Sequence, residues 1–288
     1  MINAGDLKSA LIELLFAIRE TSVRLIVGGG FGLWLKVELV QSSKAVTLLK
    51  EWPEARSTQD IDLFIRPELL INPEQLKPMA LALNNLGYQV VRGAEKYQFE
   101  KCLEPGNAAR SIKLDLLTGP AECFQGTFVK TDQRRARPNP SVGIHAHPVA
   151  EALTLEEGLL PVTLKDRGAG EPWAGVVLLP TPFTYLMMKL FAFRDRFPDQ
   201  NKAFGQYHAL DLYTILATCL EEEWDLACAL RDRYRNNPRV REAGCIVKDY
   251  FVSKDSPGSL RLRESPYYRK ELQLDDFLSA LRQLFNPC

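Results

Sequence analysis

The chain has 288 residues, of which 46% are hydrophobic and 25% are charged, a composition typical of a globular protein with one large domain or two ordinary ones. Lysine plus arginine equals aspartate plus glutamate at 36 each, so the formal net charge is zero. This balance excludes nucleic-acid binding through an overall positive charge, and any such partner must be held by local patches.

The sequence carries no pattern of a membrane or secreted protein. No apolar run is long enough to cross a bilayer, and residues 1–6 lack the basic start and apolar core of a signal peptide. The six cysteines are scattered without a CxxC pair, which argues against a zinc site and fits reduced thiols. We therefore expect a cytoplasmic protein with no membrane partner.

The chain begins with alternating helical and strand patterns. Apolar residues recur at helical spacing over residues 7–18, and residues 23–27 predict a short buried strand that leads into three glycines. Helical periodicity returns over residues 31–49 and stops near Pro53. A strand with the sequence Asp-Ile-Asp follows.

A helix is then expected over residues 73–85, with Gly87 as its C-terminal cap. Three later runs favour strands: residues 88–91, 97–103 and 111–117. This order of elements predicts an α/β or α+β fold with a mixed sheet and helices packed on it.

The pattern changes near residue 180. Residues 118–180 contain short apolar runs interrupted by proline and glycine, and they end in a buried strand over residues 176–179. From Pro182 the pattern is largely helical. We therefore expect an α/β domain over residues 1–180 and a helical C-terminal domain over residues 181–288.

The Asp-Ile-Asp strand is the most informative segment. Residues i and i+2 of a strand point to the same face, so Asp60 and Asp62 should project side by side. Two neighbouring carboxylates repel each other and ionise most readily beside a cation. Magnesium prefers such oxygen ligands and often binds one or two carboxylates together with substrate phosphates.

A third carboxylate follows on the strand predicted over residues 111–117. Strict alternation places Lys113 and Asp115 on one face of this strand and its apolar residues on the other. If the strand lies beside Asp60 and Asp62, three carboxylates converge, and such a set can hold two magnesium ions. The glycines at 28–30 would let the backbone approach phosphates closely, with amide donors at the start of the next helix.

The features occur in a fixed order: Gly29-Gly30, then Arg56-Ser57-Thr58-Gln59-Asp60-Ile61-Asp62-Leu63, then a strand with Asp115. In this order they resemble the nucleotidyltransferase fold of the DNA polymerase β-like superfamily. Within it the sequence is most similar to the AbiEii-type toxins of toxin–antitoxin systems and to the related mycobacterial nucleotidyltransferase toxins. The resemblance extends over residues 23–117 and 176–216.

The resemblance implies roles for individual residues. Asp60 and Asp62 would hold the metal ions, and Asp115 would be a metal ligand or the general base. Gly29 and Gly30 would form the phosphate-binding turn, although Gly28-Gly29 fits equally well. Further candidates for nucleotide contact near these acids are Arg56, Thr58 and Lys113. The stretch from Gly30 to Asp60 is longer than the family usually has, and an extended helix over residues 37–49 is expected to account for it.

The first C-terminal helix contains Lys189 within an almost entirely apolar segment. A buried lysine needs a carboxylate or a bound anion, unless it reaches the edge of the core. The resemblance implies that Lys189 contacts the nucleotide phosphates and that Asp211 orients it or a neighbouring base; a purely structural Asp211 is the alternative. Arg196 and Lys202 are candidates for binding the triphosphate or an RNA backbone, or are simply solvated.

Two other groups have both a functional and a structural interpretation. His145 and His147 could share a strand face and bind a metal, but no third ligand is evident and a surface strand is preferred. A local basic cluster consists of Lys130, Arg134, Arg135 and Arg137. It could follow a nucleic-acid backbone, although a solvated surface is the simpler interpretation.

The expected reaction is magnesium-dependent transfer of a nucleoside monophosphate from an NTP to an acceptor hydroxyl. By family implication the acceptor is RNA, such as a tRNA end, and the protein is a toxin with a cognate antitoxin. One alternative is a nucleotidyltransferase that modifies a small molecule or a protein. Another is a non-catalytic module that binds nucleotide or RNA.

Overall fold

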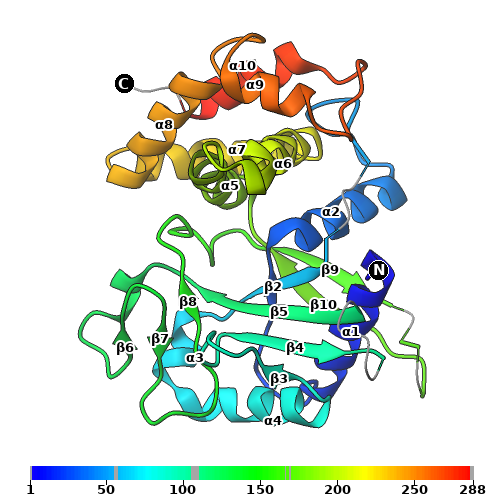
Figure 1. Cartoon of the computed structure of the whole chain (residues 1–288), viewed down its shortest axis with the longest axis vertical. Coiled ribbons are helices and arrows are strands. Elements are labelled where there is room, and N and C mark those ends of the chain that lie inside the picture. The colour runs from blue at the N-terminus through cyan, green and yellow to red at the C-terminus, as the bar shows by residue number, and fades with distance from the viewer. Residues whose placement is uncertain (1, 55–57, 105–109, 166, 169, 286–288) are drawn as a thin grey trace. The chain divides into compact units, whose positions relative to one another are not determined.

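The computed structural model describes residues 2–54, 58–104, 110–165, 167–168 and 170–285 (Figure 1). The chain divides into two compact units, and each unit is made of three segments that are separate in the sequence. Unit 1 comprises Met1–Leu35, Ser57–Ala150 and Leu159–Leu179. Unit 2 comprises Lys36–Arg56, Glu151–Gly158 and Pro180–Cys288. The sequence predicted one boundary near residue 180; the structure adds to unit 2 two shorter segments that precede this boundary.

Unit 1 is built on a mixed sheet with the order β3-β4-β5-β2-β1-β10-β9, in which β8 also pairs with β5. The strands are β1 (Ile26–Val27), β2 (Asp60–Phe64), β3 (Gln89–Val90), β4 (Gln98–Cys102), β5 (Ser111–Thr118), β8 (His147–Pro148), β9 (Leu160–Leu164) and β10 (Gly175–Leu179). Strands β2 and β5 are parallel, whereas β4 runs antiparallel to β5. The predicted α/β or α+β class with a mixed sheet is confirmed.

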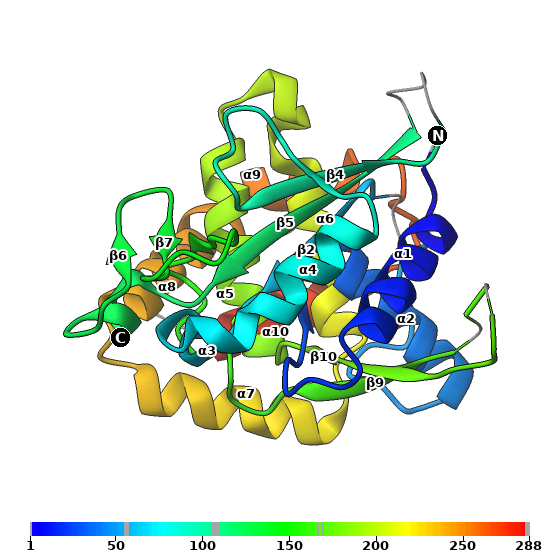
Figure 2. The same ribbon diagram turned by 90° about the horizontal axis from the view of Figure 1, so that it is seen from below.

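One face of this sheet carries the core of unit 1. Ile61 and Leu63 of β2 are fully buried, as are Leu114 and Leu116 of β5, because alternate strand residues share a face. Helix α1 (Ala4–Ala17) contacts β5, β10 and helix α4 (Lys77–Asn85). Figure 2 shows α1 and α4 on the same side of the sheet. The polar residues of β2 and β5 therefore lie on the opposite face.

Several predicted elements of unit 1 are present with shifted ends. The helix expected over residues 73–85 is divided into a 3-10 turn, η1 (Pro73–Leu76), and α4. It is preceded by the short α3 (Pro67–Ile71). Gly87 has a positive φ of 80° directly after the helix, which confirms the predicted glycine cap.

Residues 118–180, where the sequence shows little periodicity, form short elements. They are η3 (Ala121–Phe124), the hairpin β6 (Lys130–Thr131) and β7 (Ala136–Arg137), and strands β8 and β9. These strands are short or irregularly patterned, so their sequences show little periodicity. In this region the sequence predicted β10 and a surface strand around His145 and His147, where β8 lies.

Helix α2 (Gly29–Ser43) is shorter than predicted. The Ser42 hydroxyl donates to the Leu39 carbonyl and the Ser43 hydroxyl to the Val40 carbonyl, which competes with continued helix. Lys44 then adopts a positive φ of 52°. The expected helix to residue 49 is therefore wrong, and an irregular segment accounts for much of the long stretch before β2.

Unit 2 is mainly helical. Its helices are α5 (Pro182–Arg196), α6 (Gln206–Ala217), α7 (Glu221–Tyr234), α8 (Pro238–Tyr250), α9 (Pro257–Arg263) and α10 (Leu274–Leu284), with a 3-10 segment η4 (Gln200–Gly205). Thr181 caps α5 by accepting from the Thr184 N–H, and Pro182 occupies the first helical turn. Helix α5 packs on α6, α7 and α8, and aromatic side chains such as Phe193 and Phe251 fill the core between them. No helix among the described residues is both long and apolar enough to span a membrane.

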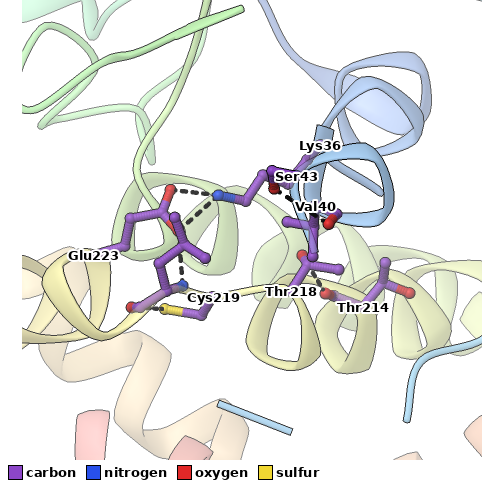
Figure 3. A network of polar contacts seen from close by, with 8 residues as sticks. Lys36, Val40, Ser43, Thr214, Thr218, Cys219 and Glu223 are labelled. Carbon is purple, nitrogen blue, oxygen red and sulfur yellow. Dashed lines mark hydrogen bonds and ion pairs between the residues drawn. The ribbon is translucent and has the colours of Figure 1, made fainter. Parts of the chain in front are cut away.

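The second half of α2 is held in unit 2 by a buried ion pair (Figure 3). Lys36 Nζ lies 2.7 Å from both carboxylate oxygens of Glu223. Glu223 also accepts from the Leu220 N–H at 2.9 Å, so it caps α7 at the same time. This pair could not be predicted from the sequence, because its partners are 187 residues apart.

Replacing Lys36 by methionine should destabilise the protein by about 2–3 kcal/mol, since Glu223 would keep a mostly buried charge without its cation. Chemical denaturation measures the loss. The double variant Lys36→Met, Glu223→Gln should recover part of it, because no unpaired charge is left. A Lys36→Met variant as stable as the native protein would show that the ion pair does not hold α2.

Candidate functional site on the polar face of strands β2 and β5

The candidate site is built on two adjacent parallel strands. Asp62 of β2 pairs with Asp115 of β5, and Asp60 pairs with Lys113. Directly paired residues of neighbouring strands share a face, so all four side chains lie on the polar side of the sheet. All three carboxylates are partly exposed, in contrast to the buried residues between them. The structure thus places the three acids on one face of two adjacent strands, the arrangement on which the predicted convergence depended.

Neighbouring side chains hold the carboxylates in place. The Thr58 hydroxyl is buried and donates to Asp60 Oδ1 at 2.7 Å. On the other side of β5, Gln98 of β4 pairs with Asp115, and its amide donates to the Asp115 carboxylate. Sequence reasoning did not select Gln98. Its strand was predicted, and strand alternation alone would have placed it beside Asp115 once the β4–β5 pairing was known.

The glycine turn packs directly against Asp62. The Gly28 N–H donates to the Asp62 carbonyl at 2.8 Å, which continues the β1–β2 ladder. Gly29 has φ +60°, and a Cβ built on it would overlap Asp62 Oδ2. Helix α2 begins at Gly29, so its N-terminus starts against the Asp62 side chain. Gly30 lies in the first turn of the helix and is buried.

Replacing Gly29 by alanine should displace the Asp62 carboxylate and destabilise the protein by more than the roughly 1–2 kcal/mol of left-handed strain. Gly87→Ala is the matched control, because Gly87 also has a positive φ but has open space where its Cβ would lie. Denaturation of both variants separates the overlap from the strain. Equal losses for the two variants would show that Gly29 does not pack against Asp62.

The environment of Asp115 opposes its ionisation. Burial raises the pKa of Asp115, and the Asp60 carboxylate raises it further by repulsion. The Gln98 hydrogen bond, Lys113 and His147 act in the opposite direction and do not cancel the rise. A carboxylate in this setting binds a proton more readily than an exposed aspartate does. A nearby cation would stabilise its ionised form.

This shift predicts a pH-dependent effect on stability. Because the folded protein holds the Asp115 proton to a higher pH than the unfolded chain does, stability falls as the pH rises from the unfolded pKa of about 3.9 through the raised pKa. Asp115→Asn should therefore be more stable than the native protein at pH 7, and the difference should vanish toward pH 4. Urea denaturation at both pH values measures it. A variant less stable at pH 7 would contradict the raised pKa.

The donor set fits a metal ion that arrives with a phosphate substrate. Among the residues that the structure describes, no three His, Cys, Asp or Glu side chains are grouped closely enough to form a complete metal site. Asp60 and Asp62 provide carboxylate oxygens on one strand face. Magnesium commonly takes one or two carboxylates and completes its shell with substrate phosphates and water. This chemistry matches the two acids of β2.

The predicted site residues outside this face have different surroundings. Arg56 lies outside the described residues. Lys189 and Asp211 belong to unit 2, where Lys189 Nζ donates to Asp211 Oδ2 at 2.6 Å and their side chains are only 9% and 4% exposed. A buried lysine was expected to pair either with a carboxylate of the protein or with a bound anion, and in the structure Lys189 pairs with a carboxylate. Arg196 and Lys202 are exposed on unit 2.

The two histidines do not share a common partner. His147 lies on β8 beside β5, and its Nδ1 donates to the Arg134 carbonyl at 2.8 Å. Burial, with help from the charges of Lys96, Arg135 and Arg137, lowers the pKa of His145 to about 4. His147 instead lies close enough to Asp115 to lower the pKa of that carboxyl. Its position beside the acids depends on the β5–β8 pairing, for which the sequence carries no signal.

Comparison with known proteins adds no family to this geometry. No protein-family model matches the sequence, and no curated protein matches it significantly.

Proposed function

We propose that the chain is a nucleotidyltransferase that moves a nucleoside monophosphate from an NTP to an acceptor hydroxyl with the help of magnesium. The observation that carries the proposal is the register of β2 and β5, which sets Asp62 opposite Asp115 and places Asp60 on the same face. The glycine turn against Asp62 supports it further, because backbone without side chains can approach a triphosphate closely.

Each residue of this face has a role in the proposed reaction. Asp60, oriented by Thr58, and Asp62 would bind the metal, and Lys113 would attract the negatively charged substrate. Magnesium, when bound, would neutralise the triphosphate and favour the attacking alkoxide. The acceptor oxygen would form a bond to the α-phosphorus while the bond to the β-phosphate oxygen breaks and pyrophosphate leaves. Asp115, with its raised pKa, is suited to take the hydroxyl proton.

Positioning and charge stabilisation would supply most of the rate enhancement, because no protein nucleophile is needed. On the resemblance of the sequence to AbiEii-type toxins, we propose RNA, such as a tRNA end, as the acceptor and a cognate antitoxin as a partner. The resemblance also assigns phosphate binding to Lys189, whose ammonium group uses one of its three N–H donors on Asp211.

The test is incubation of the protein with each α-³²P-labelled NTP, magnesium and total RNA. Label in a band of tRNA size is the expected result. Label only on protein or on small molecules would favour a different acceptor and overturn the RNA assignment. Absence of transfer to any acceptor, with the nucleotide still bound, would instead leave a non-catalytic binding module.

A further inference from the structure

A cavity of about 400 Å³ lies on unit 1 between two turns. One turn connects β3 to β4, and the other is the tip of the β6–β7 hairpin (Figure 1). The cavity is lined by Gly93, Glu95, Tyr97, Asp132, Gln133, Arg134 and Arg135. Its volume lies in the range of pockets that bind small organic molecules, such as a single nucleotide.

Tyr97 connects this cavity to the carboxylate face. It directly precedes β4, and its carbonyl accepts from the Leu116 N–H of β5 at 2.7 Å. Its ring centroid lies 5.9 Å from that of His147, whose charge acts on Asp115. The Arg134 carbonyl accepts from the same histidine. Tyr97 and Arg134 therefore contact a residue that borders the proposed catalytic acids.

The charges around the cavity favour an anionic ligand. The two acidic residues of the lining are already paired: Glu95 with Arg135, and Asp132 with Arg135 and Arg137 at 3.4 Å. Arg134 is exposed, and its guanidinium has no carboxylate partner among the described residues. Lys96 and Lys130 add further positive charge nearby. Burial lowers the pKa of His145, and the charges of Lys96, Arg135 and Arg137 lower it further, which is consistent with a positive potential here.

An aromatic residue and an exposed arginine in the lining of one cavity form a combination that suits a nucleotide. Bases stack on aromatic side chains, and arginine binds phosphate through charge-assisted hydrogen bonds. An acidic peptide would use only the arginine, whereas a nucleotide would use both the arginine and the Tyr97 ring. The combination of the ring and the free cation therefore favours nucleic acid over an acidic protein segment.

We propose that this cavity binds one nucleotide of a single-stranded nucleic acid, with its base on Tyr97 and its phosphate on Arg134. The strand would reach from the cavity past His147 to the carboxylates. The identification of this nucleic-acid strand as the acceptor rests on the proposed transfer reaction. The binding itself does not, and it can be measured without NTP or metal.

The experiment measures fluorescence anisotropy of a short, fluorescently labelled single-stranded RNA with the full chain in EDTA. Tyr97→Ala should weaken binding about tenfold, whereas Tyr97→Phe should bind like the native protein because it keeps the ring. Arg134→Ala should reduce the slope of log K against log salt concentration by about 0.7, the contribution of one phosphate contact to a single strand. Tyr97→Ala should leave that slope unchanged.

Arg24→Ala is the matched control, because Arg24 is an exposed arginine of unit 1 that does not line the cavity. It should change neither affinity nor slope. Native-like binding by both Tyr97→Ala and Arg134→Ala, or displacement of the RNA by an acidic peptide as readily as by unlabelled RNA, would overturn the proposal. Single-stranded DNA of the same sequence shows whether the 2′-hydroxyl contributes.

The double variant Asp60→Ala, Asp62→Ala separates this proposal from the proposed reaction. It should bind the RNA normally and transfer no nucleotide. If the native protein binds RNA through Tyr97 and Arg134 but transfers no nucleotide, the cavity assignment stands and the proposed reaction fails. If it transfers nucleotide but the cavity variants bind the RNA normally, the cavity assignment fails and the reaction stands.

Discussion

Asp62→Asn is expected to lower the rate of nucleotidyl transfer by about 10²–10³-fold. The substitution keeps the shape of the side chain that packs against Gly29 and removes its charge, so the loss reflects weaker binding of metal and triphosphate rather than a changed fold. Transfer of labelled nucleotide at saturating NTP measures the rate. Raising the magnesium concentration should restore part of the activity, because the remaining carboxylates still bind the ion weakly.

Asp225→Asn is a suitable control, because Asp225 is an exposed aspartate on α7 in unit 2. It should transfer nucleotide at the native rate. Thermal unfolding should show that Asp62→Asn is folded at the assay temperature. A folded Asp62→Asn variant with native activity would remove Asp62 from the reaction.

The second large effect concerns the buried pair in unit 2. Lys189→Met should destabilise the protein by about 3–5 kcal/mol, because it leaves the Asp211 carboxylate buried without its cation. Asp211→Asn should also destabilise the protein, and the double variant should be more stable than the sum of the single losses predicts. Denaturant titration of the three variants gives the coupling energy between the two side chains.

The same variants decide whether Lys189 also serves the reaction. If the pair is purely structural, the double variant Lys189→Met, Asp211→Asn should transfer nucleotide at close to the native rate wherever it is folded. If Lys189 binds phosphate, as the resemblance implies, the folded double variant should show a raised KM for NTP. A coupling energy near zero would contradict the ion pair itself.

The carboxylate face could be anticipated because strand alternation is a local property. The period of two set Asp60 and Asp62 on one face, and Lys113 and Asp115 on another strand's polar face, without any knowledge of the tertiary structure. Their convergence required the assumption that the two strands are neighbours. In the structure β2 and β5 are paired in parallel and are therefore neighbours. Their pairing is a non-local contact that the residues of either strand alone do not encode.

The parts that sequence reasoning missed depend on long-range contacts or on local competition. The Lys36–Glu223 pair and the position of His147 beside β5 join segments distant in the chain. The end of α2 was overextended because apolar periodicity persists beyond Ser43, while the serine hydroxyls and the positive φ of Lys44 end the helix. Periodicity reports which face is buried and does not by itself mark where a helix stops.

The paired comparison of native protein and the Asp60→Ala, Asp62→Ala variant tests the central claim most directly. Both are incubated with α-³²P-labelled NTP, magnesium and total RNA, and γ-³²P-labelled NTP is used in parallel. The native protein should retain the α-label on the acceptor and release the γ-label as pyrophosphate, and the variant should do neither. Undiminished transfer by the folded variant, or α-label that never leaves the nucleotide pool with native protein, would contradict a nucleotidyl-transfer site on β2 and β5.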